Sequence, residues 1–307
     1  MASSTKALLG ALAANVAIAV TKFVVGGLTG SSVMIAEGIH SLVDSGNSGL
    51  MIYGGRRSKR GPDRDHPFGH GMELYFWSLV VAMVVFGGGG GMSIYEGIHA
   101  ITHPTPLTKL WPNYLVLGAA AVFEGASLYV GLREFRAYRR EREFTGSMLD
   151  AVRKSKDPAM FLTVLEDGAA LIGLAIAAVG VTLGHLFESS VIDGVASMLI
   201  GLVLMGEALL LGYECRGLII GESARTVLVD KIRRVIERHG EVGKLEDLRT
   251  LQLGPESILV FLRIDVPTFA DVAMVRQGST DLIADLRRTF PQIRDVFFDV
   301  SPTPHAA

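Results

Sequence analysis

Long apolar runs separated by short polar segments dominate the first 211 residues of the chain. Each run holds about 20 residues, enough at about 1.5 Å per helical residue to cross a hydrocarbon core about 30 Å thick. The pattern therefore predicts an α-helical membrane protein with six transmembrane helices. Five consecutive glycines interrupt the third run, and we expect them to permit close helix approach or a bend. The predicted spans are Leu8–Leu28, Ser32–Tyr53, Glu73–Ile98, Tyr114–Gly131, Pro158–Leu183 and Val191–Leu211.

The hydrophobic pattern changes after Leu211, where shorter periodic segments replace the long apolar runs. Apolar residues recur at helical spacing in two segments, and three others have the composition and alternation of strands. The order helix–strand–strand–helix–strand predicts a small α+β domain of the ferredoxin-like sandwich type. We therefore expect a six-helix transmembrane domain over residues 1–215 and a cytoplasmic ferredoxin-like domain over residues 216–307. The helices are expected at residues 223–240 and 272–290, and the strands at 245–254, 257–267 and 293–302.

Composition supports a membrane location and excludes several other classes of protein. Hydrophobic residues make up 49% of the chain and the mean hydropathy is +0.39, which is too apolar for an ordinary soluble protein. The formal net charge of −2 gives no reason to expect a nucleic-acid partner. The single cysteine, Cys215, excludes an intrachain disulfide framework and a cysteine-rich zinc site. The first apolar run is longer than a usual signal-peptide core, so we interpret it as a membrane helix.

Positive charges gather in two of the segments between the predicted spans, and the other three such segments offer only Lys109. Because cytoplasmic loops carry the excess of Lys and Arg, both termini are expected in the cytoplasm, and an even number of spans agrees. The lack of an amphipathic, Arg- and Ser-rich leader favours a bacterial inner membrane over an organelle. The charges are Arg56, Arg57, Lys59, Arg60 and Arg64 after span two, and Arg133, Arg136, Arg139, Arg140, Arg142, Arg153, Lys154 and Lys156 after span four.

The second span contains a polar stretch, Ala36–Ile52, in the middle of apolar sequence. His40 and Asp44 are four residues apart, so on a helix both side chains lie on one face within reach of a single ion. Ionisable groups at membrane depth are costly, which makes the pair a candidate functional site. Imidazole and carboxylate ligands suit zinc and similar divalent metals. The alternative is a hydrogen bond between helices.

The fifth span offers two adjacent acids, Glu166 and Asp167. Their side chains point about 100° apart on a helix, so only one shares a face with a given partner. His40, Asp44 and Asp167 would provide three ligands, and the fourth could be water, Thr163 or Glu166. The alternative for Asp167 is a hydrogen bond to a neighbouring helix. Two further acids in the membrane portion, Glu124 and Asp193, are candidates for supporting or proton-path groups, or for interhelical hydrogen bonds.

The loop after the second span carries a compact set of polar residues, Asp63, Asp65, His66 and His70. The spacing Asp63-x-x-His66-x-x-x-His70 gathers carboxylate and imidazole groups that could hold a metal at a membrane entrance. The alternative is a solvated loop whose glycine and proline residues simply turn the chain. The sequence alone leaves both interpretations open.

These features together resemble the cation diffusion facilitator family. HSLVDSGNS in the second span, DRDHPFGHG after it, the six spans and the ferredoxin-like tail extend the resemblance over nearly the whole chain. LEDGAALIG and HPFGHGMELYFWS are similar to the branch that contains zinc transporter nine. The resemblance implies a homodimer in the lipid membrane that exchanges a divalent metal, usually zinc, for protons by alternating access. It implies no enzymatic activity and no cofactor beyond the transported cation.

The resemblance also assigns residues to sites. The family's transport site joins two residues four apart in span two to a His-x-x-x-Asp in span five. His40 and Asp44 match the first pair and Asp167 matches the Asp, but Thr163 stands at the His position. This departure affects the coordination number and therefore metal selectivity. The family's loop site matches Asp63, His66 and His70.

The family's tail often carries a further metal cluster of His and Asp residues. In this chain Glu246, Phe261, Asp299 and Ser301 stand in the corresponding strands. We therefore expect the tail to serve dimer contact rather than to hold a binuclear zinc site.

Two other functions compete with transport. A membrane scaffold or metal sensor with a dimerising tail would carry the same elements without moving metal. An intramembrane hydrolase is poorly supported, because the sequence has no HExxH motif and no convincing nucleophile–base pair. Flux in sealed vesicles separates the first two functions.

Overall fold

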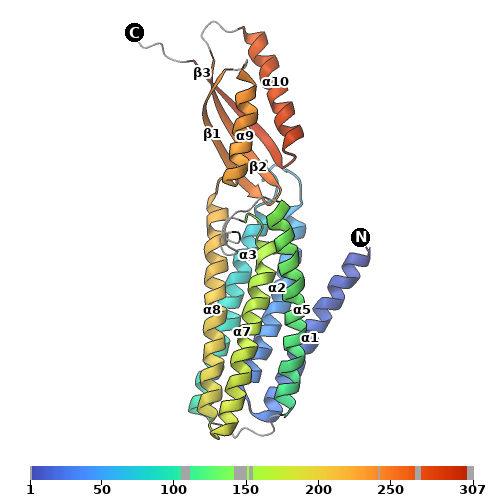
Figure 1. Ribbon diagram of the computed structural model, residues 1–307, viewed down its shortest axis with the longest axis vertical. Coiled ribbons are helices and arrows are strands. Elements are labelled where there is room, and N and C mark those ends of the chain that lie inside the picture. The colour runs from blue at the N-terminus through green and yellow to red at the C-terminus, as the bar shows by residue number, and fades with distance from the viewer. Residues whose placement is uncertain are drawn as a thin grey trace. The chain divides into compact units, whose positions relative to one another are not determined.

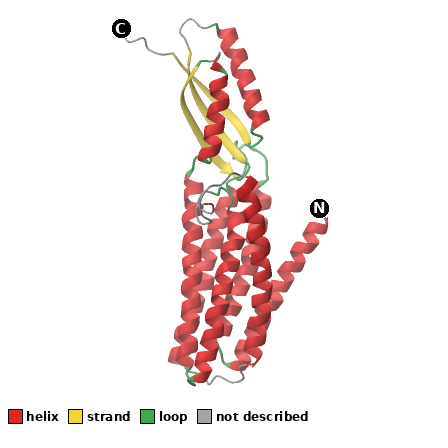
Figure 2. Cartoon of the chain, in the orientation of Figure 1, coloured by secondary structure: helices red, strands yellow, loops and turns green. Residues whose placement is uncertain are grey.

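The computed structural model describes residues 2–104, 111–141, 151, 155–240, 243–266 and 271–302. Long helices dominate the first part of the chain and run lengthwise beside one another, except that the N-terminal end of the first helix leans away from the others (Figure 1). A small unit of strands and two helices forms the C-terminal part (Figure 2). The long helices are α1 (Ala2–Thr29), α2 (Ser32–Ser58), α3 (Glu73–Val84) continued by the π-helix η1 (Val85–Gly91) and α4 (Met92–Thr102), α5 (Trp111–Glu141), α7 (Pro158–Leu186) and α8 (Ser190–Ile220).

The long helices confirm the six predicted apolar segments, but several extend further than predicted. The largest difference is in α5, which runs to Glu141 although its end was predicted at Gly131. The segment after Gly131 is rich in Arg and Glu, which favour helix, so a helix that leaves the apolar layer has no reason to stop there. Lys109, Arg142, Arg153 and Lys154 lie outside the described residues.

Membrane-spanning character is clearest in four helical segments, whose length and hydropathy suffice to cross a bilayer. The described apolar part of α1 covers Asn15–Thr29 and is shorter, and α2 is diluted by polar residues. The protein is therefore a helical membrane protein whose second helix is unusually polar for its position. The four segments are Glu73–Thr102, Trp111–Glu141, Phe161–Leu186 and Ser190–Ile220.

Glycines let the third long helix approach α8 closely. A Cβ atom added at Gly90 would lie 2.8 Å from the Gly201 carbonyl oxygen, and one added at Gly201 would lie 2.7 Å from the Gly90 carbonyl oxygen. Gly97 and Gly194 face each other's backbone in the same way one heptad away. Backbone approach of this kind is the use that membrane helices make of small residues. The predicted close approach at the glycine run is confirmed.

Asp193 ties the first turn of α8 to the start of α2. Its carboxylate accepts hydrogen bonds from the Ser31 hydroxyl at 2.9 Å, from the Ser32 hydroxyl at 2.7 Å and from the backbone N–H groups of Ser32 and Val33 at 2.6 and 3.2 Å. These donors include amides that a helix leaves unpaired at its N-terminus. Asp193 therefore has the interhelical hydrogen-bonding role that was one of its two predicted interpretations.

The second compact unit comprises Arg57–Tyr75 and Arg216–Ala307, and the first comprises Met1–Arg56 and Phe76–Cys215. In the second unit β1 and β2 are antiparallel and β2 and β3 are parallel, in the order β1-β2-β3. Alternate residues of β2 pack with both helices around one core. The helix and strand order agrees with the prediction, while the domain limits 1–215 and 216–307 stay a prediction. The elements are α9 (Thr226–Arg238), β1 (Lys244–Gly254), β2 (Ser257–Val266), α10 (Val272–Thr289) and β3 (Ile293–Pro302).

The loop of the second unit packs against its sheet. Gly71 lies so close to the Leu253 carbonyl oxygen that a side chain could not be added there. Gly69 adopts a φ of +76°, a conformation that glycine takes without strain. The Phe68 ring contacts the Phe297 ring edge to face, with centroids 6.0 Å apart. The glycines and the aromatic residue of HPFGHG therefore fix how the loop lies on the unit.

Candidate metal centres

The first candidate centre is built on α2, where His40 and Asp44 lie one helical turn apart. Their side chains are 3% and 18% exposed, and His40 Nε2 lies 3.3 Å from Asp44 Oδ2. The small residues Ser41 and Ser45 of the same helix are also buried. The predicted pairing on one helical face is thus present. Two ligand types that suit zinc meet at membrane depth.

A cavity of about 120 Å³ opens beside Asp44. This is enough for a small ion with several waters, since one water needs about 10–15 Å³ of such space. Glu166, Asp167 and Thr163 line the same cavity, and His40 adjoins it through Asp44. The fold therefore gathers the residues predicted from spans two and five around one space. The lining residues are Asn15, Ile18, Ser41, Asp44, Ser48, Glu124, Ser127, Thr163, Glu166 and Asp167.

The two adjacent acids of α7 contact different helices. Glu166 Oε1 accepts a hydrogen bond from Asn47 Nδ2 of α2 at 2.9 Å. Asp167 is bonded by the Ser127 hydroxyl of α5, and its buried Oδ2 has no hydrogen-bond partner among the described residues. The divergence expected for neighbours on a helix is therefore observed. Asp167 keeps an unused acceptor, whereas one oxygen of Glu166 is already engaged.

A buried ion pair lies next to the α2 site. Lys22 of α1 donates to Glu37 Oε2 at 2.9 Å and to the Ser41 hydroxyl at 2.8 Å, and both charged side chains are buried. Removing either partner would leave an isolated charge, which is costly inside a protein. Lys22 is thus bonded to Glu37, and its charge also acts electrostatically on Asp44 and Glu124.

One charged residue of this region was not predicted as a site residue. Glu207 lies on α8, is 9% exposed, and interacts electrostatically with Asp44 and Asp167. Neither of its carboxylate oxygens has a hydrogen-bond partner among the described residues. In the sequence Glu207 is visible only as a single acid inside an apolar span. Its spacing to other candidate ligands along the chain gives no motif, because its neighbours in space come from α2 and α7.

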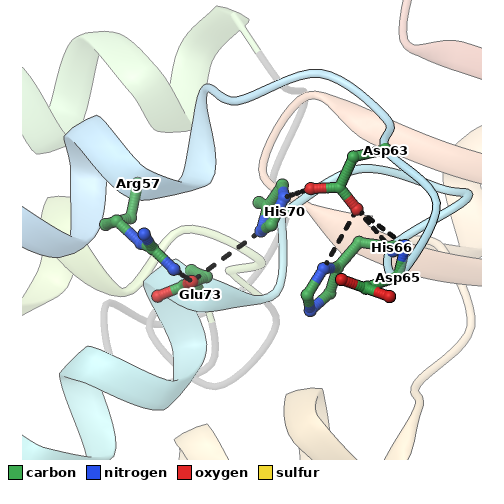
Figure 3. A network of polar contacts seen from close by, with 6 residues as sticks. All are labelled: Arg57, Asp63, Asp65, His66, His70 and Glu73. Carbon is green, nitrogen blue, oxygen red and sulfur yellow. Dashed lines mark hydrogen bonds and ion pairs between the residues drawn. The ribbon is translucent and has the colours of Figure 1, made fainter.

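The second candidate centre is the loop. Figure 3 shows the Asp63 carboxylate between two histidines: Oδ2 lies 2.8 Å from His70 Nε2 and Oδ1 lies 3.3 Å from His66 Nδ1. Oδ1 also accepts the backbone N–H groups of Asp65 at 3.0 Å and His66 at 2.7 Å, so Asp63 organises its own turn. Glu73 continues the network from His70 toward Arg57. The predicted trio is therefore assembled, while the Asp65 side chain stands beside it.

Hydrogen bonds favour the ionised form of Asp63. The His70 side chain and the backbone N–H of His66 lower the pKa of Asp63 from its usual 3.8 to about 2. A lowered pKa means that this carboxylate stabilises the folded loop fully above about pH 4. The contribution is lost as the pH falls through about 2. At neutral pH Asp63 is therefore an ionised acceptor.

The two centres differ in how tightly their ligand atoms gather. Within the described part of the chain, Asp63, His66 and His70 are the one set of three such side chains whose possible ligand atoms all lie within 4.8 Å of one another. His40, Asp44 and Asp167 are spaced more widely, so joining them on one ion requires side-chain rotation or helix movement. In the tail, Asp299 pairs with Arg263 at 2.9 Å.

Comparisons with known proteins agree on one family. The family model of the cation efflux transmembrane domain matches residues 8–220. The chain is 32% identical over 233 residues to "Proton-coupled zinc antiporter SLC30A9, mitochondrial" of Homo sapiens, which covers 76% of this chain and 41% of that protein. It is 30% identical over 262 residues to "Metal tolerance protein C4" of Arabidopsis thaliana, covering 85% and 57% of the two chains.

A bacterial relative matches over nearly its whole length. "Manganese efflux system protein MneP" of Bacillus subtilis (strain 168) is 23% identical over 305 residues, which cover 97% of this chain and 96% of that one. By contrast, the chain spans only about two-fifths of the zinc antiporter, at 41% of its length.

Proposed function

The chain belongs to the cation diffusion facilitator family, and from this premise we propose that it is a proton-coupled efflux transporter of divalent metal, with zinc as its main cargo. This is a family of transporters rather than enzymes. The observation that carries the proposal is the pair of buried His40 and partly buried Asp44 beside a cavity that Asp167 also lines. Buried ionisable groups at membrane depth are expensive, and a cation that passes between them accounts for their presence.

The chemistry of the ligands supplies the coupling to protons. Metal binds to neutral imidazole and ionised carboxylate, so metal and protons compete for His40, Asp44 and Asp167. His40 is the group whose usual pKa lies nearest to neutral pH, which makes it the natural proton carrier. Rocking of the helix bundle would expose the site to each side of the membrane in turn. Protonation of the ligands would release the metal from the site, and loss of these protons would allow metal to bind again.

The loop centre gathers metal at the cytoplasmic entrance in this proposal. Its compact trio of Asp63, His66 and His70 has the donor types of a zinc site and lies outside the membrane spans. Exposed Asp63 and His66 are accessible to solvent metal, while buried His70 anchors the set to the loop. The loop therefore assists delivery, and the membrane residues define transport.

The proposed setting is a bacterial inner membrane, with both termini in the cytoplasm and two copies joined by the tails. The excess of Arg and Lys after spans two and four supports this orientation. The nearly full-length match to a Bacillus protein supports a bacterial membrane. The stacked, partly exposed Phe261 and Phe297 rings offer a surface in the tail for a second copy.

Reconstituted flux tests the proposal. Purified protein in sealed proteoliposomes should move zinc, and a pH gradient should change the rate. Cadmium, manganese, iron and cobalt measured in parallel give the order of preference. A scaffold or sensor would bind metal without flux in any of these conditions, and that outcome would exclude the transporter.

A further inference from the structure

Glu207 stands out among the charged residues of the membrane unit because of where α8 places it. Leu204 and Leu211, three residues before and four after it, share its face of the helix, and both are almost completely buried. Glu207 therefore points into the helix bundle and not toward lipid. Its 9% exposure would suit an apolar side chain at this position, yet the residue is an acid.

The carboxylate lacks the partners that a buried acid usually has. Both of its oxygens are buried without a hydrogen-bond partner in the part of the chain that the structure describes. Asp193, on the same helix, is 1% exposed and accepts four hydrogen bonds from the start of α2. Burying a carboxylate without such bonds costs several kcal/mol, roughly, unless another group compensates. Helix α8 thus carries two buried acids: Asp193, whose carboxylate accepts four hydrogen bonds, and Glu207, whose carboxylate accepts none from the described residues.

The surroundings of Glu207 are rich in negative charge. Asp44 of α2 and Glu166 and Asp167 of α7 interact with it electrostatically, and Glu124 of α5 interacts with Glu166 and Asp167 in turn. Lys22 is bonded to Glu37 and also acts electrostatically on Asp44 and Glu124, while His40 is paired with Asp44. Among the described residues, no side-chain cation forms an ion pair with Glu166, Asp167 or Glu207. A divalent cation is the ligand that such a set attracts.

We propose that Glu207 is a ligand of the transported divalent cation, so that α8 contributes to the transport site together with α2 and α7. The inference rests on the proposed transport function and adds a residue to the site. In the family pattern a histidine ligand stands at the position of Thr163. In this chain a carboxylate from α8 would replace that missing metal ligand. Because η1 packs on α8 through Gly90 and Gly201, cation binding also links the third long helix to the site.

Zinc titration of purified protein in detergent tests the inference, with Glu207→Gln as the main variant. The amide keeps the size of the side chain and removes its charge. We expect zinc affinity to fall by at least about tenfold, the loss typical even for groups that only support a metal ligand. The melting temperature without metal should stay the same or rise, because an uncompensated charge has been removed. The rise in melting temperature on adding zinc should shrink.

Asp193→Asn is the matched control, since it neutralises a buried acid on the same helix. It should lower the melting temperature without metal and leave zinc affinity within about threefold, because it breaks hydrogen bonds and not a metal ligand. Glu207→Asp keeps the charge but shortens the side chain, so it should bind zinc more tightly than Glu207→Gln. If Glu207→Gln does not fold, Glu207→Asp decides: weaker zinc binding at an unchanged metal-free melting temperature supports the inference, and unchanged binding overturns it.

Wild-type zinc affinity in Glu207→Gln overturns the assignment while wild-type protein transports zinc. If the effect of a pH gradient on flux is lost at the same time, Glu207 is a proton carrier. If the metal-free melting temperature falls instead, its role is structural. Wild-type protein that neither binds nor moves any of the five metals would overturn the proposed function, and the inference with it.

Discussion

Thr163 is the residue at which this chain departs most clearly from the zinc pattern of its family. It lies one turn before Asp167 on α7 and lines the same cavity, and its side chain is exposed enough to be enlarged. Thr163→His should therefore tighten zinc binding by about tenfold or more, because it adds an imidazole on the face that carries Asp167. Calorimetric titration of the variant measures the change. Unchanged zinc affinity in both Thr163→His and Asp167→Asn would show that α7 does not supply the site.

Glu166 and Asp167 should respond differently to neutralisation. Glu166 has one oxygen engaged by Asn47, whereas Asp167 has a buried oxygen without a partner among the described residues. Asp167→Asn should therefore weaken zinc binding more than Glu166→Gln does. The same titration under identical conditions compares the two variants. Equal losses would make Glu166 a full ligand and leave less room for water at the site.

The sequence predicted which candidate ligands lie near one another where those residues are also close together in the chain. The spacing of His40 and Asp44, and of Asp63, His66 and His70, follows from one helix turn or one short loop. Glu207 could not be predicted in this way, since its neighbours are on other helices and nothing local distinguishes a ligand from a tolerated acid. Pairings such as Glu166 with Asn47 depend on helix rotation, which the sequence does not specify.

At the scale of elements, hydrophobic periodicity predicted the three strands and α10 to within one residue at each end, whereas α9 is shorter than predicted by three residues at its start and two at its end. Strand β3 was expected at residues 293–302 and is observed at Ile293–Pro302, because alternation and Pro302 mark its limits. The end of α5 was missed because its last turns are rich in Arg and Glu, although Phe135 in this extension is fully buried. The π-helical turns of η1 were also not predicted. In this segment Gly90 packs against α8, a contact between helices that the local sequence does not specify.

The glycine contact between η1 and α8 can be tested by comparing two glycines of η1. A Cβ at Gly90 would press on Gly201 and on Met205 of α8, whereas one at Gly87 has nothing within 4 Å. Gly90→Ala should therefore destabilise the protein by about 1–3 kcal/mol, the usual cost of overpacking, and Gly87→Ala should not. Thermal unfolding in detergent compares the two variants. Equal melting temperatures would mean that this contact does not constrain the bundle.

The loop is the other element whose contribution can be isolated. Replacing Asp63, His66 and His70 together by alanine should slow zinc flux by about tenfold or less, because the proposed transport site in the membrane remains intact. Asp65→Asn serves as the control in the same loop, since its side chain stands outside the trio. Flux at limiting zinc concentration measures the effect. Complete loss of flux, with zinc still bound in the membrane unit, would make the loop essential to transport.

At the scale of the whole molecule, transport and dimerisation are expected to reside in different parts of the chain. The membrane unit holds His40, Asp44 and Asp167, while the second unit has its own core of α9, α10 and the sheet. The fold of each part could be predicted from the sequence, because each part has its own hydrophobic pattern. The way in which two copies join could not be predicted, because no pattern within one chain specifies a partner surface.

This separation gives the strongest test of the transport site. Asp44→Ala should lower zinc flux by at least about a hundredfold, because it removes a charged ligand that pairs with His40 at the wall of the cavity. The mass of the purified variant in detergent, measured by light scattering, should remain that of a dimer, since no residue of the second unit is changed. Glu188→Gln, in the exposed turn between α7 and α8, controls for the loss of one acid. Wild-type flux in Asp44→Ala would remove α2 from the transport site. A monomeric variant would show instead that the membrane helices hold the dimer together.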